Sequence, residues 1–215
     1  HMVKLDILSD PVCPWCYIGK SYLERAMEKA GDHPFIIEWH PYQLDPTIPE
    51  GGVDRTAYME KKFGGKEGWK QAYLPLVEHA KKAGVTLNHD LVKRNPNTLD
   101  AHRLIHWAGI EQKQTFVVNS LFKAYWVEGR DIGDHEVLVD IASKAGLDAA
   151  MIAKLLASDA DKDEIKARQD HSRKMGVSSV PTFVVANQHV VQGAQPASLW
   201  ENVIADLNTQ LAERE

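Results

Sequence analysis

The sequence predicts an α/β protein in which a βαβ unit and a ββα unit are separated by a long all-helical segment. Apolar residues first alternate, then recur at helical spacing, and then form a second run, which together indicate the βαβ unit. Strand patterns then disappear and return only at Thr182, near the C-terminal end. The two groups of strands therefore enclose the helical segment in the sequence.

The βαβ unit occupies the N-terminal part of the chain. Residues 3–8 alternate between apolar and polar side chains, as in a half-buried strand. From Cys16 to Ala30 the apolar residues have helical spacing, and Gly31 follows as a typical helix stop. Residues 35–39 form a second apolar run. Because a helix joins the two strands, we expect them to be parallel neighbours in a sheet.

Residues 42–53 are rich in Pro, Gly and Asp, a composition typical of a linker. Beyond them the apolar spacing predicts helices only. Asp134 and Asp148 are placed to cap two of these helices, and Asp161 with Glu164 resembles a capping box at a third. The expected helices cover residues 54–63, 67–83, 98–109, 113–128, 134–145, 148–158 and 161–175.

Strand character returns in the C-terminal part of the chain. Residues 182–185 and 189–191 are apolar runs separated by a turn at Asn187-Gln188, which indicates an antiparallel hairpin. Pro196 then opens an amphipathic helix. These elements make up the ββα unit.

The order of the elements predicts the fold. When the helical segment is left out, the order is βαβ–ββα, which is that of a thioredoxin-like fold. We therefore expect the helical segment to be an insertion into one domain. The expected boundaries place residues 1–53 and 177–215 in a discontinuous thioredoxin-like domain and residues 54–176 in the helical insertion.

Composition and charge exclude several classes of function. The chain has 215 residues and a formal net charge of −5, so we expect neither a nucleic-acid partner nor a membrane partner. No apolar stretch approaches the roughly 18 residues that a membrane span needs. The chain has 2 cysteines, which excludes a four-thiolate zinc site and argues against a framework of structural disulfides. We expect no bound metal.

The first residues bear on the cellular compartment. His1-Met2 is typical of the remnant of an expression tag, and His1 is set aside from any metal site. A patterned segment begins almost at once, without the basic and then apolar leader of a secreted protein. This start predicts a cytoplasmic protein, although a leader removed in cloning would leave the same start.

The motif Cys13-Pro14-Trp15-Cys16 stands where the first helix begins. Two thiols at this spacing can close a small disulfide and reopen it, and the positive end of the helix dipole favours a thiolate at Cys13. We expect Cys13 to be the more exposed, attacking thiol and Cys16 to resolve the mixed disulfide. Pro14 suits the first helical turn. Half of a zinc site and two incidental thiols are the alternatives, and the position after a strand favours redox chemistry.

A second motif is Val180-Pro181, just before the C-terminal hairpin. A proline at the very start of a strand is one of the few that a sheet accepts, and from its spacing the bond could be trans or cis. A cis bond would hold the backbone in a tight turn. Such a turn could present the N–H and C=O groups of Val180 to an extended substrate beside Cys13.

Other residues are weaker candidates for binding. His102 and His106 share one helix face and could line a cleft above the cysteines, where a histidine would stabilise a thiolate or bind glutathione; ordinary helix histidines are the alternative. Asn97 and Thr98 precede the same helix, and capping explains them as well as ligand binding does. An aromatic ring between two redox cysteines is hard to bury, so we expect Trp15 to contact a partner or glutathione.

Together these motifs resemble the DsbA-like branch of the thioredoxin superfamily. The resemblance rests on the C-P-W-C motif, the helical insertion and the V-P-T sequence before the hairpin, and it spans essentially the whole chain. Three stretches are similar to the FrnE-type group within that branch: residues 95–104, residues 176–183 and residues 193–196.

The resemblance implies a protein disulfide oxidoreductase that needs no bound cofactor beyond its redox-active disulfide. It implies that Cys13 is the nucleophile, that Cys16 is the resolving cysteine and that Val180-Pro181 is a cis-proline loop. It also implies that the helical insertion covers the redox end of the sheet. The group is usually cytoplasmic. The dipeptide between the cysteines lacks the histidine of strongly oxidising relatives, so we expect a less oxidising centre, and the second cysteine pair of some relatives is absent.

A neighbouring branch keeps a second activity open. Kappa-class glutathione transferases and 2-hydroxychromene-2-carboxylate isomerases share the inserted fold, bind glutathione and typically have serine where this chain has Cys13. The dithiol favours exchange with protein or small-molecule disulfides, with glutathione as a possible reductant. The alternatives are a glutathione-dependent isomerase or transferase and, outside enzymes, a redox-sensing binding module. The sequence leaves the reduction potential, the natural substrate and the oligomeric state open.

Overall fold

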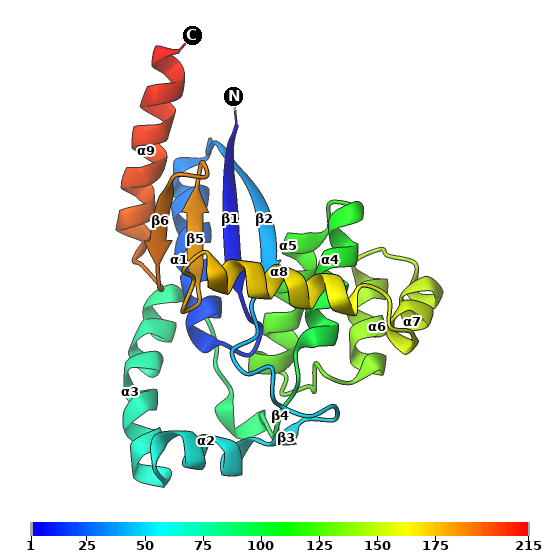
Figure 1. The fold of residues 1–215 in the computed structure, drawn as a ribbon. Coiled ribbons are helices and arrows are strands. Elements are labelled where there is room, and N and C mark those ends of the chain that lie inside the picture. Colours follow the sequence, from blue (N-terminus) through cyan, green and yellow to red (C-terminus); the bar gives the residue numbers. More distant parts are fainter. Residues whose placement is uncertain (1, 215) are drawn as a thin grey trace.

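The computed structural model describes residues 2–214, so His1 lies outside the described part. Its main sheet (Figure 1) contains β1 (Val3–Ser9), β2 (Phe35–Pro41), β5 (Thr182–Val185) and β6 (His189–Gln192). The strand order is β2-β1-β5-β6. β1 is parallel to β2 and antiparallel to β5, and β6 is antiparallel to β5. The predicted α/β fold with a C-terminal hairpin is confirmed.

Helices α1 (Pro14–Ala30) and α9 (Ala197–Glu213) pack against each other beside this sheet (Figure 1). Trp200 of α9 is fully buried, and its ring lies edge-on to Phe35 of β2 and Phe183 of β5. Burial of apolar area is the main favourable term in folding, and a tryptophan contributes more of it than most residues. The two ends of the chain are thus joined in one core.

The region between β2 and β5 is mainly helical, as predicted. Asp134 and Asp148 cap their helices as expected, with side chains that accept hydrogen bonds from the backbone N–H groups of Glu136 and Met151. The helices are α2 (Arg55–Phe63), α3 (Lys66–Ala83), α4 (Leu99–Ile110), α5 (Gln114–Phe122), α6 (His135–Lys144), α7 (Ala149–Ala157) and α8 (Lys162–Lys174), with a 3₁₀ turn at His89–Leu91 and a π-helical turn at Lys123–Val127.

These helices meet the rest of the molecule in two places. Helices α4, α5 and α8 contact β2, and the backbone N–H of Trp39 donates to Gln114 Oε1 at 3.0 Å while its ring N–H donates to Thr115 Oγ1 at 2.9 Å. Cover of this kind protects an edge strand from pairing with other chains. Helices α2 and α3 instead extend beyond the end of the sheet, where α3 contacts α1 (Figure 1).

Two sequence-based expectations are wrong. Strand pairing is not absent from the helical region, because β3 (Val53–Asp54) pairs antiparallel with β4 (Arg94–Asn95); two-residue strands are too short to show a periodicity. Asp161 does not form a capping box, since its φ is 62° and its carboxylate accepts a 2.8 Å hydrogen bond from the ring of Trp107. The division at residues 53 and 177 stays a prediction.

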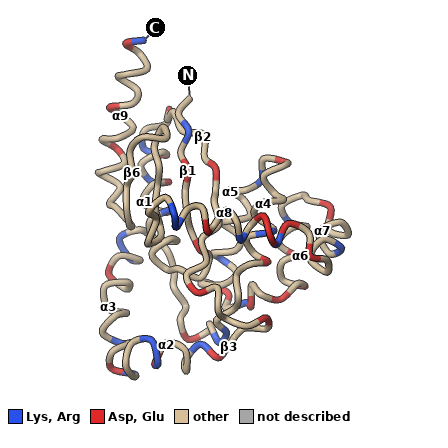
Figure 2. Tube along the Cα trace, in the orientation of Figure 1, with Lys and Arg blue, Asp and Glu red and all other residues tan. Residues whose placement is uncertain are grey.

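The surface carries mixed charge. In the view of Figure 2, acidic and basic residues are interspersed along the outer helices rather than segregated by sign. A mixed surface gives no electrostatic reason to expect a polyanionic partner. Within residues 2–214, no helix has both the length and the apolar character needed to cross a bilayer.

Candidate active site

The cysteine motif forms the turn between β1 and α1. Cys13 occupies the N-cap position of α1, Pro14 is the first helical residue, and the N–H of Cys16 lies 3.1 Å from the carbonyl oxygen of Cys13. The N–H of Cys13 in turn donates to the carbonyl of Asp10 at 2.9 Å. Proline at the first helical position loses no hydrogen bond. The motif therefore sits at the positive end of the helix dipole, as the sequence predicts.

Both cysteines are free thiols, and both are buried: Cys13 is 4% exposed and Cys16 is 1% exposed. Cys13 is the more exposed of the two, as the sequence predicts, and it lines the wall of a cavity that Cys16 does not reach. Burial raises the pKa of the Cys16 thiol well above its ordinary value, and the adjacent Cys13 sulfur raises it further. Cys16 therefore stays protonated near neutral pH and reacts poorly with external disulfides.

The Val180-Pro181 loop lies against this turn. The Sγ of Cys13 is 3.8 Å from the carbonyl oxygen of Val180, and the bond between Val180 and Pro181 is cis. The carbonyl of Pro181 accepts a 2.8 Å hydrogen bond from the N–H of Gly193, and Thr182 Oγ1 donates to the carbonyl of Ser179 at 2.7 Å. Residues 193–196, which the sequence singles out, thus support the proline loop from the far side.

Gly19 lets α1 pass close to this loop. A Cβ at that position would lie 3.1 Å from Cγ of Pro181 and 3.3 Å from Cα of Ala194, tighter than ordinary van der Waals contact. A glycine inside a helix costs stability relative to alanine, so its presence needs a packing reason. Contact with the proline loop supplies that reason. The sequence contains this signal, but it does not identify the partner.

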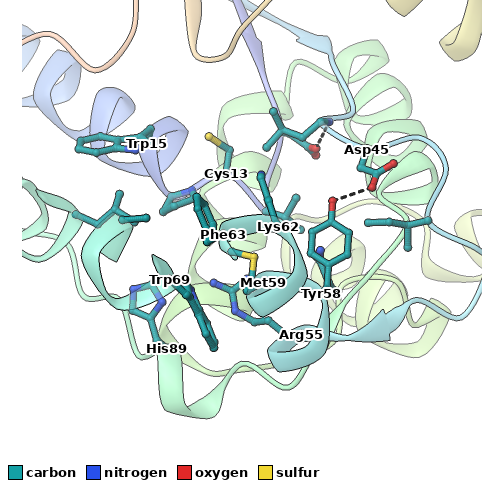
Figure 3. A pocket seen from close by; sticks show the side chains of 18 of the residues that line it. Cys13, Trp15, Asp45, Arg55, Tyr58, Met59, Lys62, Phe63, Trp69 and His89 are labelled. Carbon is teal, nitrogen blue, oxygen red and sulfur yellow. Dashed lines mark hydrogen bonds between the residues drawn. The ribbon is translucent and has the colours of Figure 1, made fainter. Parts of the chain in front are cut away.

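A cavity of about 310 Å³ lies over Cys13, between the cysteine turn and helices α2 and α3 (Figure 3). Its lining is largely apolar and includes Met59, Phe63 and Trp69. Trp15 also lines it, with its ring edge-on to the ring of His79 at 5.3 Å. An apolar concave site with a few polar groups is the usual form of a small-molecule site. The arrangement gives a small ligand access to the Cys13 sulfur.

Two polar side chains in the cavity wall, Asp45 and Tyr58, are bonded to each other. The carboxylate of Asp45 accepts hydrogen bonds from Thr47 and, at 2.7 Å, from the hydroxyl of Tyr58. Burial would raise the pKa of Asp45, but these hydrogen bonds outweigh it and hold the pKa below its usual range. Burial and the bond to Asp45 raise the pKa of Tyr58 to about 12. Both groups therefore keep fixed protonation states near neutral pH.

His102 and Asn97 do not line this cavity. His102 is buried, and its Nε2 lies 3.1 Å from Oδ1 of Asp10, whose other oxygen accepts from the N–H of Leu44 at 2.9 Å. His106 lies apart from it, with Nδ1 3.2 Å from a guanidinium nitrogen of Arg168. His102 therefore holds Asp10 from behind the cavity wall, and His106 contacts α8 away from the cavity.

Asn97 likewise lies outside the cavity wall and bonds to neighbouring segments of the chain. Its Oδ1 accepts hydrogen bonds from Gln43 Nε2 at 3.0 Å and from the N–H of Leu99 at 2.9 Å, and its Nδ2 donates to the carbonyl of Ile48 at 2.7 Å. The bond to Leu99 is of the capping kind that the sequence left open beside ligand binding, whereas Thr98, the N-cap residue of α4, makes no side-chain capping bond. The other two bonds tie the start of α4 to the segment that follows β2.

Sequence reasoning missed the cavity residues from the helical region. Arg55, Trp69 and His89 reach the cavity from α2, α3 and the 3₁₀ turn, respectively. Nothing in a single sequence distinguishes a buried arginine from an exposed one, since burial here comes from tertiary packing. The only available signal is that these residues lie in the segment expected to cover the cysteines.

Comparison with known proteins agrees with this geometry. The family model described as the DSBA-like thioredoxin domain matches residues 4–205. The chain belongs to this family. The YwbO protein of Bacillus subtilis, which is uncharacterized, is 29% identical over 205 residues, covering 95% of this chain and 96% of its own length. The DsbA-like resemblance seen in the sequence is confirmed.

Several solved structures share the fold of this chain. A probable DsbA oxidoreductase from Streptomyces coelicolor is 27% identical with a TM-score of 0.84, over 95% of this chain and 89% of its own. A 2-hydroxychromene-2-carboxylate isomerase is 19% identical with a TM-score of 0.74, over 99% of both chains. The cytosolic disulfide reductase DsbM of Pseudomonas aeruginosa with GSH is 21% identical with a TM-score of 0.68, over 97% of this chain and 99% of its own. The last two show the fold alone.

Proposed function

We propose that this member of the DSBA-like family is a thiol–disulfide oxidoreductase of the FrnE type whose centre is the pair Cys13 and Cys16. One observation carries the proposal. The Cys13 sulfur lies at the cavity wall beside the carbonyl of Val180, while Cys16 is buried behind it with a raised pKa. This asymmetry matches one attacking thiol and one resolving thiol.

The proposed reaction proceeds by two exchanges. The Cys13 thiolate, stabilised by the N-terminus of α1, attacks one sulfur of a substrate disulfide; that S–S bond breaks, and the other sulfur leaves as a thiolate that takes up a proton. Cys16 then loses its proton and attacks Cys13, which releases the second substrate thiol. The substrate gains two electrons and two protons, and the enzyme pair becomes a disulfide. A thiol reductant such as glutathione returns the pair to the dithiol.

The Val180 backbone is the proposed contact for an extended substrate. Its carbonyl oxygen lies at 3.8 Å from the attacking sulfur, so a substrate strand bonded there would place its own sulfur next to Cys13. Trp15, in the cavity wall, is the proposed apolar contact for the substrate or for glutathione. Pro14 and Pro181 shape the two turns that meet at the sulfur.

Loss of either sulfur tests the proposal. In Cys13→Ser, reduction of insulin or of a mixed glutathione disulfide should disappear. In Cys16→Ser, the first exchange should still occur, and the mixed disulfide on Cys13 should accumulate and be visible by mass spectrometry. Reduction by Cys13→Ser at the rate of the unaltered protein would contradict the proposal.

The apolar cavity favours one alternative, a glutathione-dependent isomerase or transferase that acts on an aromatic substrate. This activity would use Cys13 or only the bound glutathione, so turnover would survive Cys16→Ser. A redox-sensing binding module is the non-enzymatic alternative. It would show captured protein partners in Cys16→Ser but no catalytic turnover of disulfides by the unaltered chain.

The cytoplasm remains the proposed compartment, and a disulfide reductase described as cytosolic is among the proteins of similar fold.

A further inference from the structure

Arg55 is a buried cation without an anionic partner. It is 2% exposed and lines the cavity over Cys13 (Figure 3). Its Nε has no hydrogen-bond partner, and its Nη1 makes only a long contact of 3.4 Å with the hydroxyl of Tyr125. Within residues 2–214, no carboxylate oxygen lies within 4.0 Å of its guanidinium. The rings of Trp126 and Trp69 lie 5.0 and 5.9 Å from its central carbon.

The other fully buried guanidinium of the described chain shows what a structural arginine looks like here. Arg103 is 0% exposed, and every nitrogen of its guanidinium has a partner. Its Nη1 pairs with Asp100 at 2.8 Å, and the group also donates to the carbonyls of Leu155, Leu156, Ser158 and Ala160. A buried arginine that serves only to join helices therefore has a hydrogen-bond partner for every guanidinium nitrogen in this fold. Arg55 is left with free donors.

An unpaired buried cation costs free energy. The desolvation free energy of a buried charge is offset only by a counterion and hydrogen bonds. Each of the two indole rings contributes about 2 kcal/mol or less by its cation–π contact. The carboxylates that share the cavity wall do not pair with Arg55, because Asp10 is bonded to His102 and Leu44, and Asp45 to Thr47 and Tyr58. Lys62 is the second cation in that wall, and because it is exposed, water solvates its charge. The positive charge of Arg55 is thus available to a ligand.

His89 lines the same cavity, and in the view of Figure 3 the ring of Trp69 lies between it and Arg55. Both of its ring nitrogens are shielded from solvent and have no hydrogen-bond partner. Burial and the positive charge of Arg55 lower the pKa of His89 to about 3. The ring is therefore neutral near neutral pH and carries one N–H donor that adds no second charge.

We propose that Arg55 and His89 form a carboxylate-binding subsite for a small acidic thiol or disulfide whose sulfur meets Cys13. A guanidinium and a carboxylate make paired, charge-assisted hydrogen bonds, and these are stronger in an apolar cavity than in water. The cavity of about 310 Å³ fits a small organic molecule, and its apolar lining suits a short hydrocarbon body between sulfur and carboxylate. The subsite rests on the proposed function, because the sulfur must reach Cys13.

Three symmetrical disulfides that differ only in the terminal group test this subsite: 3,3′-dithiodipropionate, 2-hydroxyethyl disulfide and cystamine. We expect kcat/KM to be about tenfold higher for the dicarboxylate than for the neutral compound, and lowest for the cationic one; tenfold corresponds to about 1.4 kcal/mol. In Arg55→Met, the advantage of the dicarboxylate should disappear while the rate with the neutral disulfide stays within about twofold. The matched control is Arg94→Met, since Arg94 is exposed, lies outside the cavity wall and carries the same charge.

The outcomes separate this subsite from the proposed function. If the unaltered protein reduces none of the three disulfides, the proposed function fails. If it reduces the neutral one but shows no preference for the dicarboxylate, or keeps the preference in Arg55→Met, the subsite alone is overturned. Should Arg55→Met fail to fold, inhibition of the unaltered protein by small competitors tests the subsite instead. Propionate should inhibit reduction of the dicarboxylate and propionamide should not, and equal effects would overturn the subsite.

Discussion

The Cys13 sulfur and the Val180 carbonyl oxygen lie 3.8 Å apart, although 167 positions separate the two residues in the chain. Pairing of β1 with β5 brings them together, since Leu8 is in register with Thr182 just beyond the loop. The sheet therefore fixes the distance between the attacking sulfur and the backbone that we propose receives the substrate. Sites carried on sheet ends and helix starts keep such distances better than loops do.

The cavity gives access to Cys13 but not to Cys16, and this difference predicts selective alkylation. In Cys16→Ser, iodoacetamide should modify Cys13 readily at pH 7, whereas in Cys13→Ser the remaining Cys16 should react at least about tenfold more slowly, because its pKa is raised by burial. Mass spectrometry of timed samples measures both rates. In urea the two variants should react alike, and equal rates in the folded state would contradict the assignment of roles.

The close approach of Gly19 to the Pro181 loop predicts that a larger side chain there lowers both activity and stability. Gly19→Val should push the Pro181 loop away from α1 and lower disulfide reduction by about tenfold or more, since small displacements near reacting atoms are costly. The overpacking should cost about 1–3 kcal/mol of unfolding free energy, which urea unfolding measures. Ser21→Val, on the same helix and only partly buried, is the control and should leave the rate unchanged.

His89 predicts a pH dependence of stability. Its pKa is about 3 in the folded chain, below the ordinary 6.5 that it regains on unfolding. Between these values the unfolded chain binds more protons, so the free energy of unfolding is highest above pH 6.5 and falls as the pH drops toward 3. From pH 7 to pH 5 this single group should account for about 1–2 kcal/mol.

The phenylalanine variant isolates that contribution. His89→Phe keeps an aromatic ring against Tyr73 and Trp126 but has no titrating group. Urea unfolding at pH 7 and pH 5 should therefore show a smaller loss of stability in His89→Phe than in the unaltered protein. Identical losses in the two proteins would show that His89 titrates normally in the folded state.

The two buried arginines should respond in opposite ways to the same substitution. Arg103→Met removes the charged partner of Asp100 Oδ1 and the guanidinium bonds to the carbonyls of Leu155 and Ser158, and it should cost about 3–5 kcal/mol. Arg55→Met removes an unpaired buried charge and should leave stability equal or higher. Thermal unfolding of both variants measures this. A large loss in Arg55→Met would mean that Arg55 is structural and would weaken the case for a ligand there.

Much of the fold and the cysteine centre could be predicted from the sequence because their causes are local. Asp134 and Asp148 cap helices through neighbouring N–H groups, and the position of Cys13 follows from the strand before it and the helix after it. These features depend on side chains a few residues apart. The resemblance to the DsbA-like branch then adds Val180 as a partner of Cys13.

The remaining features depend on tertiary packing. His102 has the spacing of a residue facing the cavity, but a hydrogen bond to buried Asp10 holds it behind the wall. Asp161 occupies a position typical of a capping residue, but its carboxylate instead accepts a hydrogen bond from the ring N–H of Trp107. Arg55 reaches the cavity because α2 and α3 fold over the cysteine turn, and no local pattern shows where such a pair of helices will lie.

The redox equilibrium of Cys13 with Cys16 tests the central claim most directly. The protein would be equilibrated in buffers of defined ratio of reduced to oxidised glutathione, trapped with acid and counted for free thiols by mass spectrometry. We predict one two-electron transition between dithiol and internal disulfide, at a potential more negative than the roughly −120 mV of strongly oxidising DsbA. A chain that keeps both thiols, or stops at a mixed disulfide on Cys13 without ever bonding Cys16, would contradict the account.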